Sequence, residues 1–489
     1  MADALVFGSG FCGTLTAQIA KRYGYDVRLI DRRPHPRFAI GESTTPLGSN
    51  LLASICEEHN VPELRFLCEY GTATPGASRQ ETVGDDFEGR PRLPRSLSPC
   101  EREETPGDPP AASNASLATA SGGTPGVDRP PTVGLKRGFT YVRHDPRREP
   151  AVNDGDLLMF AASSADAVSD THWLRADVDA HAVAVAGVPL EIGDVRPPNG
   201  VPVIDATGGG KLFDLPAVPD NVFRTRSSAV YTHVRGLRRL TDCCDVRGGV
   251  PFDPDAAAVH HLLEEGWMWQ LRFDDGRVSV GLCFEGWGDR SEADARQVIA
   301  RYPMLRRQFA DAEVCESPGG WITAPRLQRR LADAGGRAML PSSFGFVDPM
   351  HSTGLALNLA QVARWAAAIR DAAGGPFPRL PVGPLAEEQR FVDAVVSLAY
   401  RTRRDMTAFE AAASLHVAAA MSCENTPDPQ RAQLVTPPVV RAAEEMHAAL
   451  DGGGGAELTA IATAAVRECG VECLFDPAVN RRYAATAAR

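Results

Sequence analysis

The first residues of the chain that could do chemistry are three glycines with the spacing of a nucleotide-binding turn: Gly8, Gly10 and Gly13. They follow a short apolar run and precede a segment with the apolar spacing of a helix. This arrangement permits a tight turn and brings a pyrophosphate close to a helix N-terminus. A second apolar run ends at Asp31, where a carboxylate can accept the ribose hydroxyls. Residues 4–31 are therefore predicted to form a βαβ unit that binds a dinucleotide. A glycine-rich turn without a nucleotide is the alternative.

A strand-like run over 201–210 ends in a second acidic and glycine-rich turn, which contains Asp205 and Gly208. Such a strand returns the chain to the nucleotide about 200 residues after the first turn. This separation, with β-rich sequence between and after, fits an FAD protein better than an NAD dehydrogenase. No second glycine fingerprint lies within a βαβ pattern, so we expect the electrons to come from an external donor.

Two aromatic residues, Trp267 and Trp269, stand two apart in a strand-like run. Side chains two apart on a strand point to the same face of the sheet. The pair could line a substrate pocket, or it could simply pack a sheet, which is the commoner role of tryptophan.

The segment 345–354 combines an acidic turn with a predicted helix start, and it carries Asp348, Pro349, His351, Ser352, Thr353 and Gly354. A helix N-terminus offers unpaired N–H groups and the positive end of a dipole. It can bind an anion or the electron-rich edge of a reduced flavin. His351 is the one histidine in a chemically loaded stretch, and we expect the others to be surface or hydrogen-bonded core residues.

Lysine is rare in this chain, which has 51 Lys and Arg residues but only three lysines: Lys21, Lys136 and Lys211. A codon bias toward arginine explains the low count. A lysine that persists under such a bias can occupy a place where an amine is required. Lys136 lies in a strand-like run over 133–142, and a surface position at the strand edge is its alternative interpretation.

The composition excludes several classes of protein. The net charge is −11, which disfavours a nucleic-acid partner. Eleven cysteines without a CxxC pair argue against a disulfide scaffold and against a metal site, and they fit reduced thiols in a cytoplasmic protein. No apolar run is long enough to span a membrane, and the start of the chain has no signal-peptide pattern.

The elements that must position these residues fall into four predicted regions. We expect a βαβ unit followed by a helix, a proline-rich disordered or mobile insertion, a sheet-containing core with antiparallel strands over 222–290, and a mostly helical end. Helices are also expected over 171–184, 293–312 and 353–370. The four regions are 1–84, 85–131, 132–370 and 371–489.

Five blocks of the chain together resemble the flavin-dependent halogenases. They are the turn at 8–13, the segment Gly41-Glu42-Ser43-Thr44-Thr45-Pro46, the segment 134–139 around Lys136, the run 267–272, and the turn at 348–354. The resemblance implies an α/β, FAD-binding Rossmann-like fold of the GR2-type flavoprotein monooxygenases, with an antiparallel sheet wall and a helical C-terminal region. It also places Gly41, Glu42, Ser43 and Thr44 beside the flavin, as cofactor-binding residues.

The same resemblance implies a reaction. Reduced FAD (FADH2) arrives from a separate NAD(P)H flavin reductase and reacts with O2, and chloride or bromide binds near Ser352, Thr353 and Gly354. Hypohalous acid then reaches Lys136 and halogenates an electron-rich aromatic small molecule of the phenol, pyrrole or indole type, free or carrier-tethered. A lysine suits this step because its amine can form a chloramine, whereas an arginine stays protonated. His351 could act as the base.

Some positions depart from the family pattern. Leu271-Arg272 replaces the Ile-Pro that ends the family's WxWxIP signature, and His351 stands where tryptophan-acting members carry a glutamate. Leu340-Pro341-Ser342-Ser343 replaces a GDA sequence, and the stretch 182–200 is short for the usual β-meander. An FAD-dependent monooxygenase, another oxidoreductase on the same fold, and a decayed non-catalytic homologue are therefore the alternatives to a halogenase.

Overall fold

Five parallel strands form the sheet that carries the glycine-rich turn, in the order β16-β8-β1-β2-β7. Their bounds in the computed structural model are β1 Ala4–Phe7, β2 Val27–Asp31, β7 Leu190–Ile192, β8 Val203–Asp205 and β16 Ala338–Met339. The register pairs Phe7 with both Ile30 and Asp205, so the carboxyl ends of β1, β2 and β8 meet at one edge. The predicted βαβ unit and the returning strand are confirmed, and the short stretch 182–200 supplies the end of a helix and the edge strand β7.

The structure describes residues 2–68, 70, 130–161, 170–246, 250–424, 434–452, 457–475 and 483–484. Almost all of the predicted insertion 85–131 lies outside these residues. The division of the chain into these four regions stays a prediction. The main apolar core of the described residues is continuous from Ala4 to Leu474, because helices from different regions pack on one another.

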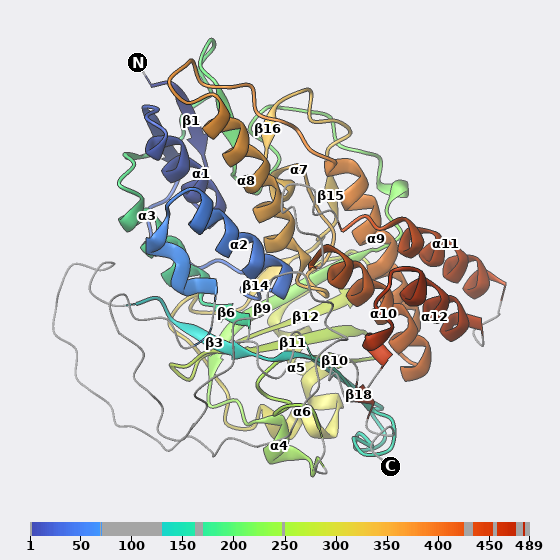
Figure 1. Cartoon of the computed structure of the whole chain (residues 1–489). Helices are drawn as coiled ribbons and strands as arrows, with labels where there is room; N and C mark the ends of the chain where they lie inside the picture. The colour runs from blue at the N-terminus through green and yellow to red at the C-terminus, as the bar shows by residue number, and fades with distance from the viewer. Residues whose placement is uncertain are drawn as a thin grey trace, which may run out of the picture.

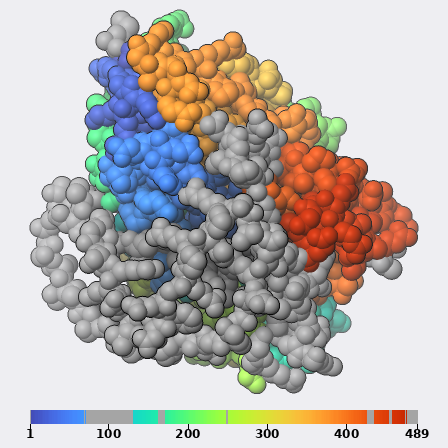
Figure 2. Space-filling model, viewed as in Figure 1, coloured from blue at the N-terminus to red at the C-terminus, as the bar shows by residue number. Residues whose placement is uncertain are grey.

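Helices cover the parallel sheet. They are α1 Phe11–Arg22, α2 Pro46–Glu58, α3 Arg175–Ala186 and α8 Thr353–Asp371. Helix α8 packs against both α1 and α2, although more than 290 residues of sequence separate it from them (Figure 1). The space-filling view shows the same neighbourhood, with the orange residues of α8 beside the blue N-terminal part of the chain (Figure 2). This packing brings the N-terminus of α8 to the edge where the glycine turn lies.

A second, larger sheet has the order β13-β9-β12-β11-β10-β4-β5-β18, and β14 also pairs with β9. Its long strands are β4 Gly138–Arg143, β5 Leu157–Ala161, β9 Ser227–Arg235, β10 Ala258–Leu262, β11 Gly266–Arg272 and β12 Val278–Glu285. The short ones are β13 Glu313–Val314, β14 Ile322–Ala324 and β18 Tyr483–Ala484. The predicted antiparallel pairing is confirmed for β9, β11 and β12 and for β10 with β11, whereas β10 and β4 are parallel. More than 100 residues separate β4 from β10, so no hairpin turn imposes an antiparallel direction on them.

The predicted helical end is present as α9 Leu385–Thr402, α10 Met406–Glu424, α11 Pro437–Asp451 and α12 Leu458–Glu468. The region expected to be helical over 293–312 contains α5 Glu292–Arg301 and α6 Pro303–Gln308. The helix expected over 171–184 begins later, because β6 Asp170–Trp173 pairs with β3 Val133–Lys136 before α3 starts. Within the described part of the chain, no helix is long and apolar enough to cross a membrane.

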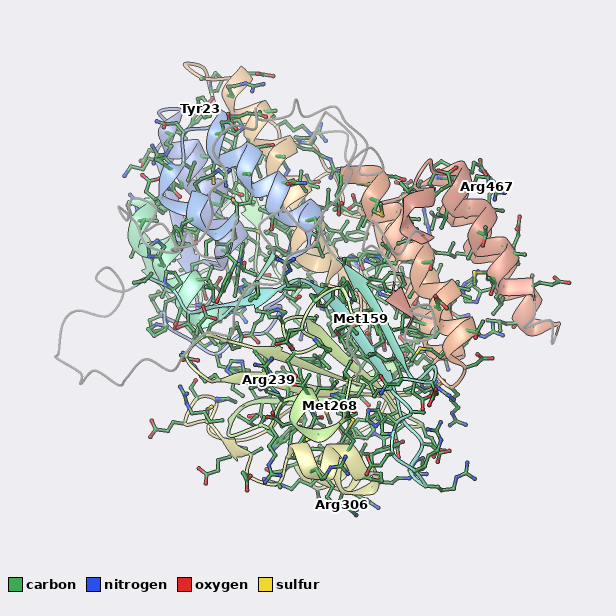
Figure 3. The ribbon with its side chains drawn as sticks, turned by 60° about the horizontal axis from the view of Figure 1, so that its bottom comes forward. Tyr23, Met159, Arg239, Met268, Arg306 and Arg467 are labelled. Carbon is green, nitrogen blue, oxygen red and sulfur yellow. The ribbon has the colours of Figure 1, made fainter. Side chains whose placement is uncertain are left out.

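The alternation along β11 sorts its side chains between two faces. Met268 packs with Val298, Ile299 and Leu305 of α5 and α6, and Figure 3 shows it directly above these two helices (Figure 3). The neighbouring tryptophans therefore point to the opposite face of the sheet.

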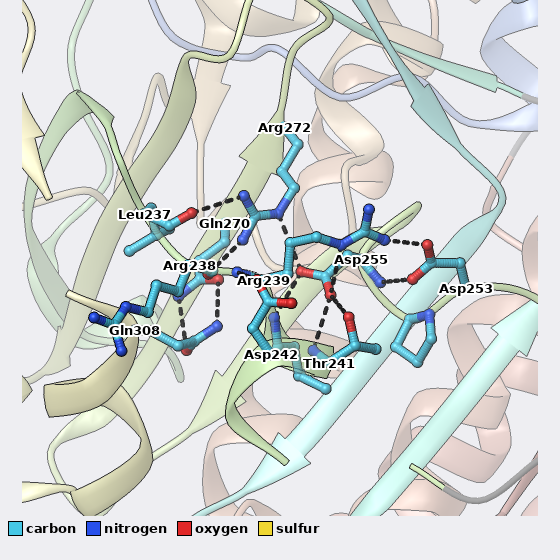
Figure 4. A network of polar contacts seen from close by, with 12 residues as sticks. Leu237, Arg238, Arg239, Thr241, Asp242, Asp253, Asp255, Gln270, Arg272 and Gln308 are labelled. Carbon is cyan, nitrogen blue, oxygen red and sulfur yellow. Dashed lines mark hydrogen bonds and ion pairs between the residues drawn. The ribbon is translucent and has the colours of Figure 1, made fainter. Parts of the chain in front are cut away.

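Arg272, at the end of β11, holds a polar network beneath the large sheet (Figure 4). Its Nε donates to Asp255 Oδ1 at 3.1 Å, and its two terminal nitrogens donate to the carbonyls of Leu237 and Arg238. The Asp255 carboxylate is buried and also accepts from the backbone N–H groups of Leu240 and Thr241. Arg272, which departs from the halogenase signature, thus stabilises this network. The other departing residue, Leu271, lines a cavity on the opposite face of the sheet.

We predict that Arg272→Leu lowers the free energy of unfolding by about 2 kcal/mol, because it removes the closer of the two guanidinium groups, Arg272 and Arg239, that pair with the buried Asp255 carboxylate. Urea denaturation measures the change. Arg238→Ala is the matched control, because Arg238 pairs with Asp311 at the surface and its loss should leave the midpoint unchanged. Equal midpoints for the wild type and Arg272→Leu would contradict the prediction.

Candidate functional site

A cavity of about 590 Å³ lies at the carboxyl edge of the parallel sheet and extends to the large sheet. A cavity at this edge is the usual ligand site of open α/β sheets. Fifteen of the predicted site residues line it: Gly8, Gly10, Gly13, Asp31, Gly41, Glu42, Ser43, Gly208, Trp267, Trp269, Asp348, Pro349, Ser352, Thr353 and Gly354. The fold therefore collects into one cavity residues that are up to 346 positions apart in the sequence.

The glycine turn has room for a ligand at one position only. A Cβ on Gly13 would lie 2.2 Å from the Gly8 carbonyl oxygen, so the protein itself requires glycine there. A Cβ on Gly10 would have its nearest neighbours at 3.8 Å and 3.9 Å, in Arg175 and Asp179. Gly10 also begins α1 without a side-chain cap. The backbone is therefore approachable at Gly10, while the neighbouring Phe11 N–H donates to the Asp179 carboxylate at 2.9 Å.

Asp31 is held ionised at the end of β2. Its Oδ2 accepts hydrogen bonds from the Ser9 N–H, the Ser9 hydroxyl and Arg37, each at 2.7 Å. Burial alone would raise the pKa of Asp31, but these donors outweigh it and lower the pKa. Sequence reasoning found the carboxylate but missed Arg37, which carries no motif.

The N-terminus of α8 faces the cavity. Its N-cap residue, Ser352, adopts a left-handed conformation with φ of +53°, which turns the chain into the helix. A Cβ on Gly354 would meet nothing within 4 Å, so the space in front of the first turn is open. Because α8 has 19 residues, its positive end favours an anion here.

The two tryptophans both line the cavity and pack the sheet. Trp269 Nε1 donates to the Ser279 hydroxyl at 3.1 Å, and Trp267 Nε1 donates to the Tyr400 hydroxyl at 3.0 Å. The rings lie 5.8 Å apart, and both side chains are buried. The prediction that they share one face is confirmed.

Asp348 joins the acidic turn to two other elements. Its Oδ2 accepts from the Ser227 hydroxyl at 2.8 Å and from the Tyr400 hydroxyl at 2.9 Å, and its Oδ1 accepts from the Met350 N–H. Burial raises the pKa of Asp348 to about 6, although these donors oppose the shift. Ser227 and Tyr400 were not predicted, because nothing in their local sequence marks them.

Lys136 is fully buried, so the alternative of a surface lysine is wrong. Its Nζ donates to the Thr44 carbonyl and lies 4.1 Å from the centre of the Phe139 ring. Two flanking glycines make this burial possible. A Cβ on Gly134 would lie 1.9 Å from the Arg272 carbonyl oxygen, and one on Gly138 would lie 2.0 Å from that of Phe160.

Four buried histidines accompany Lys136, and we call them the histidine cluster: His172, His260, His351 and His416. Burial, followed by the nearby charge of Lys136, lowers the pKa of His172 to about 3 and of His416 to about 4, and it also lowers that of His260. His351 stacks on His416 with ring centres 4.4 Å apart. All four are therefore neutral at pH 7.

The expectation that histidines other than His351 are surface or satisfied core residues is wrong for several of them, two of which belong to the histidine cluster. The Nδ1 atoms of His172 and His260 are buried and have no hydrogen-bond partner among the described residues. His260 also lines the cavity and contacts the Trp267 ring at 4.8 Å. Its ring centre lies 5.7 Å from that of Phe139, which Lys136 contacts, so His260 links the cavity wall to the surroundings of Lys136. His351 itself, with both ring nitrogens unpartnered in the described structure, is not in the cavity wall.

Lys136 and two other predicted residues, Asp205 and Thr44, also lie outside the wall. The Asp205 carboxylate accepts from the N–H and hydroxyl of Thr207, so it shapes its own turn. Thr44 is buried, and its hydroxyl donates to the Thr171 carbonyl. Glu42, two residues earlier, lines the cavity, and its carboxylate forms a hydrogen bond of 3.1 Å with His233 Nε2. The segment 41–44 thus contacts the cavity at one end and Lys136 at the other.

Protonation of the histidine cluster should destabilise the fold in acid. The folded-state pKa of His416 is about 4 against an ordinary 6.5, so its neutral form stabilises the fold above pH 6.5 and this contribution is lost as the pH falls toward 4. As the pH falls, we expect the free energy of unfolding of His416→Leu to decrease less steeply than that of the wild type, by up to about 1.4 kcal/mol per pH unit. Urea denaturation between pH 7 and 5 measures the slope. Leu415→Ala, on the same helix, should keep the wild-type slope, and an unchanged slope in His416→Leu would refute the prediction.

No protein-family model matches the chain. In sequence, it is 26% identical over 411 residues to the monodechloroaminopyrrolnitrin halogenase PrnC of Pseudomonas fluorescens, covering 76% of this chain and 62% of that protein. It is 23% identical over 396 residues to the tetracycline 7-halogenase of Kitasatospora aureofaciens, covering 72% of this chain and 60% of that protein. The chain therefore matches about three fifths of the length of these relatives.

Solved structures share the fold. The halogenase PltM, solved with phloroglucinol and FAD, has a TM-score of 0.73 at 20% identity, with 96% of each chain covered. The flavin-dependent brominase Bmp2 has a TM-score of 0.54 at 14% identity, covering 92% of this chain and 98% of that one. The chain thus has the fold of flavin-dependent halogenases and resembles halogenases in sequence over about three quarters of its length.

Proposed function

We propose that this chain is an FADH2-dependent halogenase that places chlorine or bromine on an electron-rich aromatic small molecule. The observation that carries the proposal is the buried ammonium of Lys136, which contacts Phe139 and the Thr44 carbonyl next to the wall of a cavity suited to a dinucleotide. The similarity to two halogenases and the halogenase fold support it.

The residues around the cavity fit FAD. The turn at Gly8, Gly10 and Gly13 would hold the pyrophosphate, and Asp31 would hold the ribose. The segment that begins at Gly41, together with the N-terminus of α8, would hold the flavin. Reduced FAD supplies the electrons that activate O2 for the oxidation of chloride or bromide. Because the described residues carry one dinucleotide turn, a separate NAD(P)H flavin reductase would deliver the reduced cofactor.

The first turn of α8 would bind the halide. Ser352, Thr353 and Gly354 line the cavity, and the positive end of the helix dipole favours an anion. The wall formed by Trp267 and Trp269 would keep bulk water and an aromatic substrate away from the flavin. Excluding water in this way protects a hypohalous acid from leakage.

Lys136 would polarise or carry the oxidised halogen at the substrate. Its ammonium can donate a hydrogen bond to hypohalous acid, and its amine can form a chloramine. The histidine cluster is neutral, and His351, in its unprotonated form, would act as the base toward a phenol or toward the halogenated ring. PltM was solved with phloroglucinol, a phenol, which favours a phenolic substrate here as well.

Gly10→Ala tests the cofactor part of the proposal. The added methyl group has room within the protein but faces the path of the pyrophosphate, so we expect FAD to bind about tenfold more weakly, a loss of about 1.4 kcal/mol. Flavin fluorescence titration measures the affinity, and thermal melting of the cofactor-free protein checks the fold. Gly48→Ala, in α2 and outside the cavity wall, should bind FAD as the wild type does. Equal affinities in all three proteins would argue against FAD in this cavity.

Lys136→Met tests the halogenation step. Purified protein with FAD, a flavin reductase, NADH, O2 and bromide or chloride is incubated with a panel of free and carrier-tethered phenols, pyrroles and indoles, and mass spectrometry identifies the products. We expect halogenated product from the wild type and at least about a 100-fold loss in Lys136→Met. Lys21→Met removes an exposed lysine and should keep full activity. Oxygenated product that forms without halide, or full activity of Lys136→Met, would overturn the proposal.

A further inference from the structure

A second cavity, of about 600 Å³, lies where the start of β9 meets helices α9 and α11. Charged and polar side chains line it, among them Arg224, Arg401, His447 and Asp451. A polar cavity of this size holds water. The mechanism proposed above does not use this cavity, yet one of its wall residues reaches the first cavity through a hydrogen bond.

That wall residue is Tyr400 of α9. Its hydroxyl lies 2.9 Å from Asp348 Oδ2, and Asp348 lines the first cavity. The direction of this hydrogen bond follows from a third residue. Trp267 can only donate, and its Nε1 donates to the Tyr400 oxygen at 3.0 Å. The phenolic hydrogen therefore points to Asp348. One tyrosine and one carboxylate thus span the wall between the two cavities.

We propose that Asp348 and Tyr400 form a proton path from the second cavity to the first. This inference rests on the proposed function, which consumes a proton from solvent in each turnover. Reduced FAD, O2, halide ion, an aromatic C–H and one proton give FAD, the aryl halide and two waters. In one concerted step, Tyr400 passes its hydroxyl proton to the Asp348 carboxylate and receives the solvent proton that water in the second cavity delivers, so that no tyrosinate forms. Asp348 then releases its proton into the first cavity, and both residues return to their starting states.

The surroundings of the pair favour this path. Asp348 is buried among Ser227 of β9, Cys283 of β12 and Tyr400, and the thiol of Cys283 has a pKa raised well above its ordinary value by burial. Burial likewise raises the pKa of Tyr400, so the phenol stays protonated. The pKa of Asp348, about 6, lets the carboxyl both take and release a proton near neutral pH. Ser227 donates to the same oxygen but is not in the wall of the second cavity.

The test measures how fast the Asp348 carboxyl exchanges its proton with solvent. Infrared spectroscopy of the FAD-loaded protein at pH 5 follows the protonated-carboxyl band after mixing with D2O. Asp348→Asn identifies the band, and labelling with ¹³C-aspartate assigns it if that variant does not fold. We expect Tyr400→Phe to slow the exchange at least about tenfold, a barrier higher by about 1.4 kcal/mol.

Ser227→Ala is the matched control. Both variants remove one hydrogen bond from Asp348 Oδ2 and should raise its pKa, but only Tyr400→Phe interrupts the path. Ser227→Ala should therefore exchange at the wild-type rate. Wild-type exchange in Tyr400→Phe, equal slowing in both variants, or the absence of an Asp348 band would each overturn the proton path. Because the measurement needs neither halide nor substrate, its result is independent of whether the chain halogenates the aromatic panel.

Discussion

The burial of the Lys136 ammonium is the constraint on which the site depends. Removing a charge from water is costly, so the protein must supply polar or polarisable groups in its place. Here a backbone carbonyl at Thr44 and the face of Phe139 do so. Each comes from a different part of the sequence, and Gly134 and Gly138 allow the strands to approach closely enough. The residues around Lys136 are therefore constrained by packing before any chemistry is considered.

The same constraint shapes the charge of the neighbourhood. Four neutral histidines share the interior with the ammonium, because burial and the positive charge both disfavour a second cation. The imidazoles therefore remain neutral beside the ammonium and do not repel it.

Successive side chains of a strand in the large sheet point to opposite faces, and this separates structural from functional residues. Met268 faces α5 and α6, whereas Trp267 faces the cavity and orients Tyr400 toward Asp348. At the end of the same strand, Arg272 stabilises the network around Asp255. The departure from the halogenase signature at Arg272 is thus explained by a contact beneath the sheet, and Leu271 keeps an aliphatic side chain in the cavity wall.

The sequence by itself determined what depends on local spacing. The glycine turn, Asp31, the start of α8 and the shared face of the two tryptophans follow from the periods of strands and helices and from turn chemistry. Only the tertiary structure decided which distant residues meet. Tyr400, Ser227, His260 and Arg37 lie in stretches without a motif, and His416 is one residue of an alanine-rich helix. Their roles arise from contacts across tens to hundreds of positions, and such contacts leave no pattern in a single sequence because the packing of whole elements sets them.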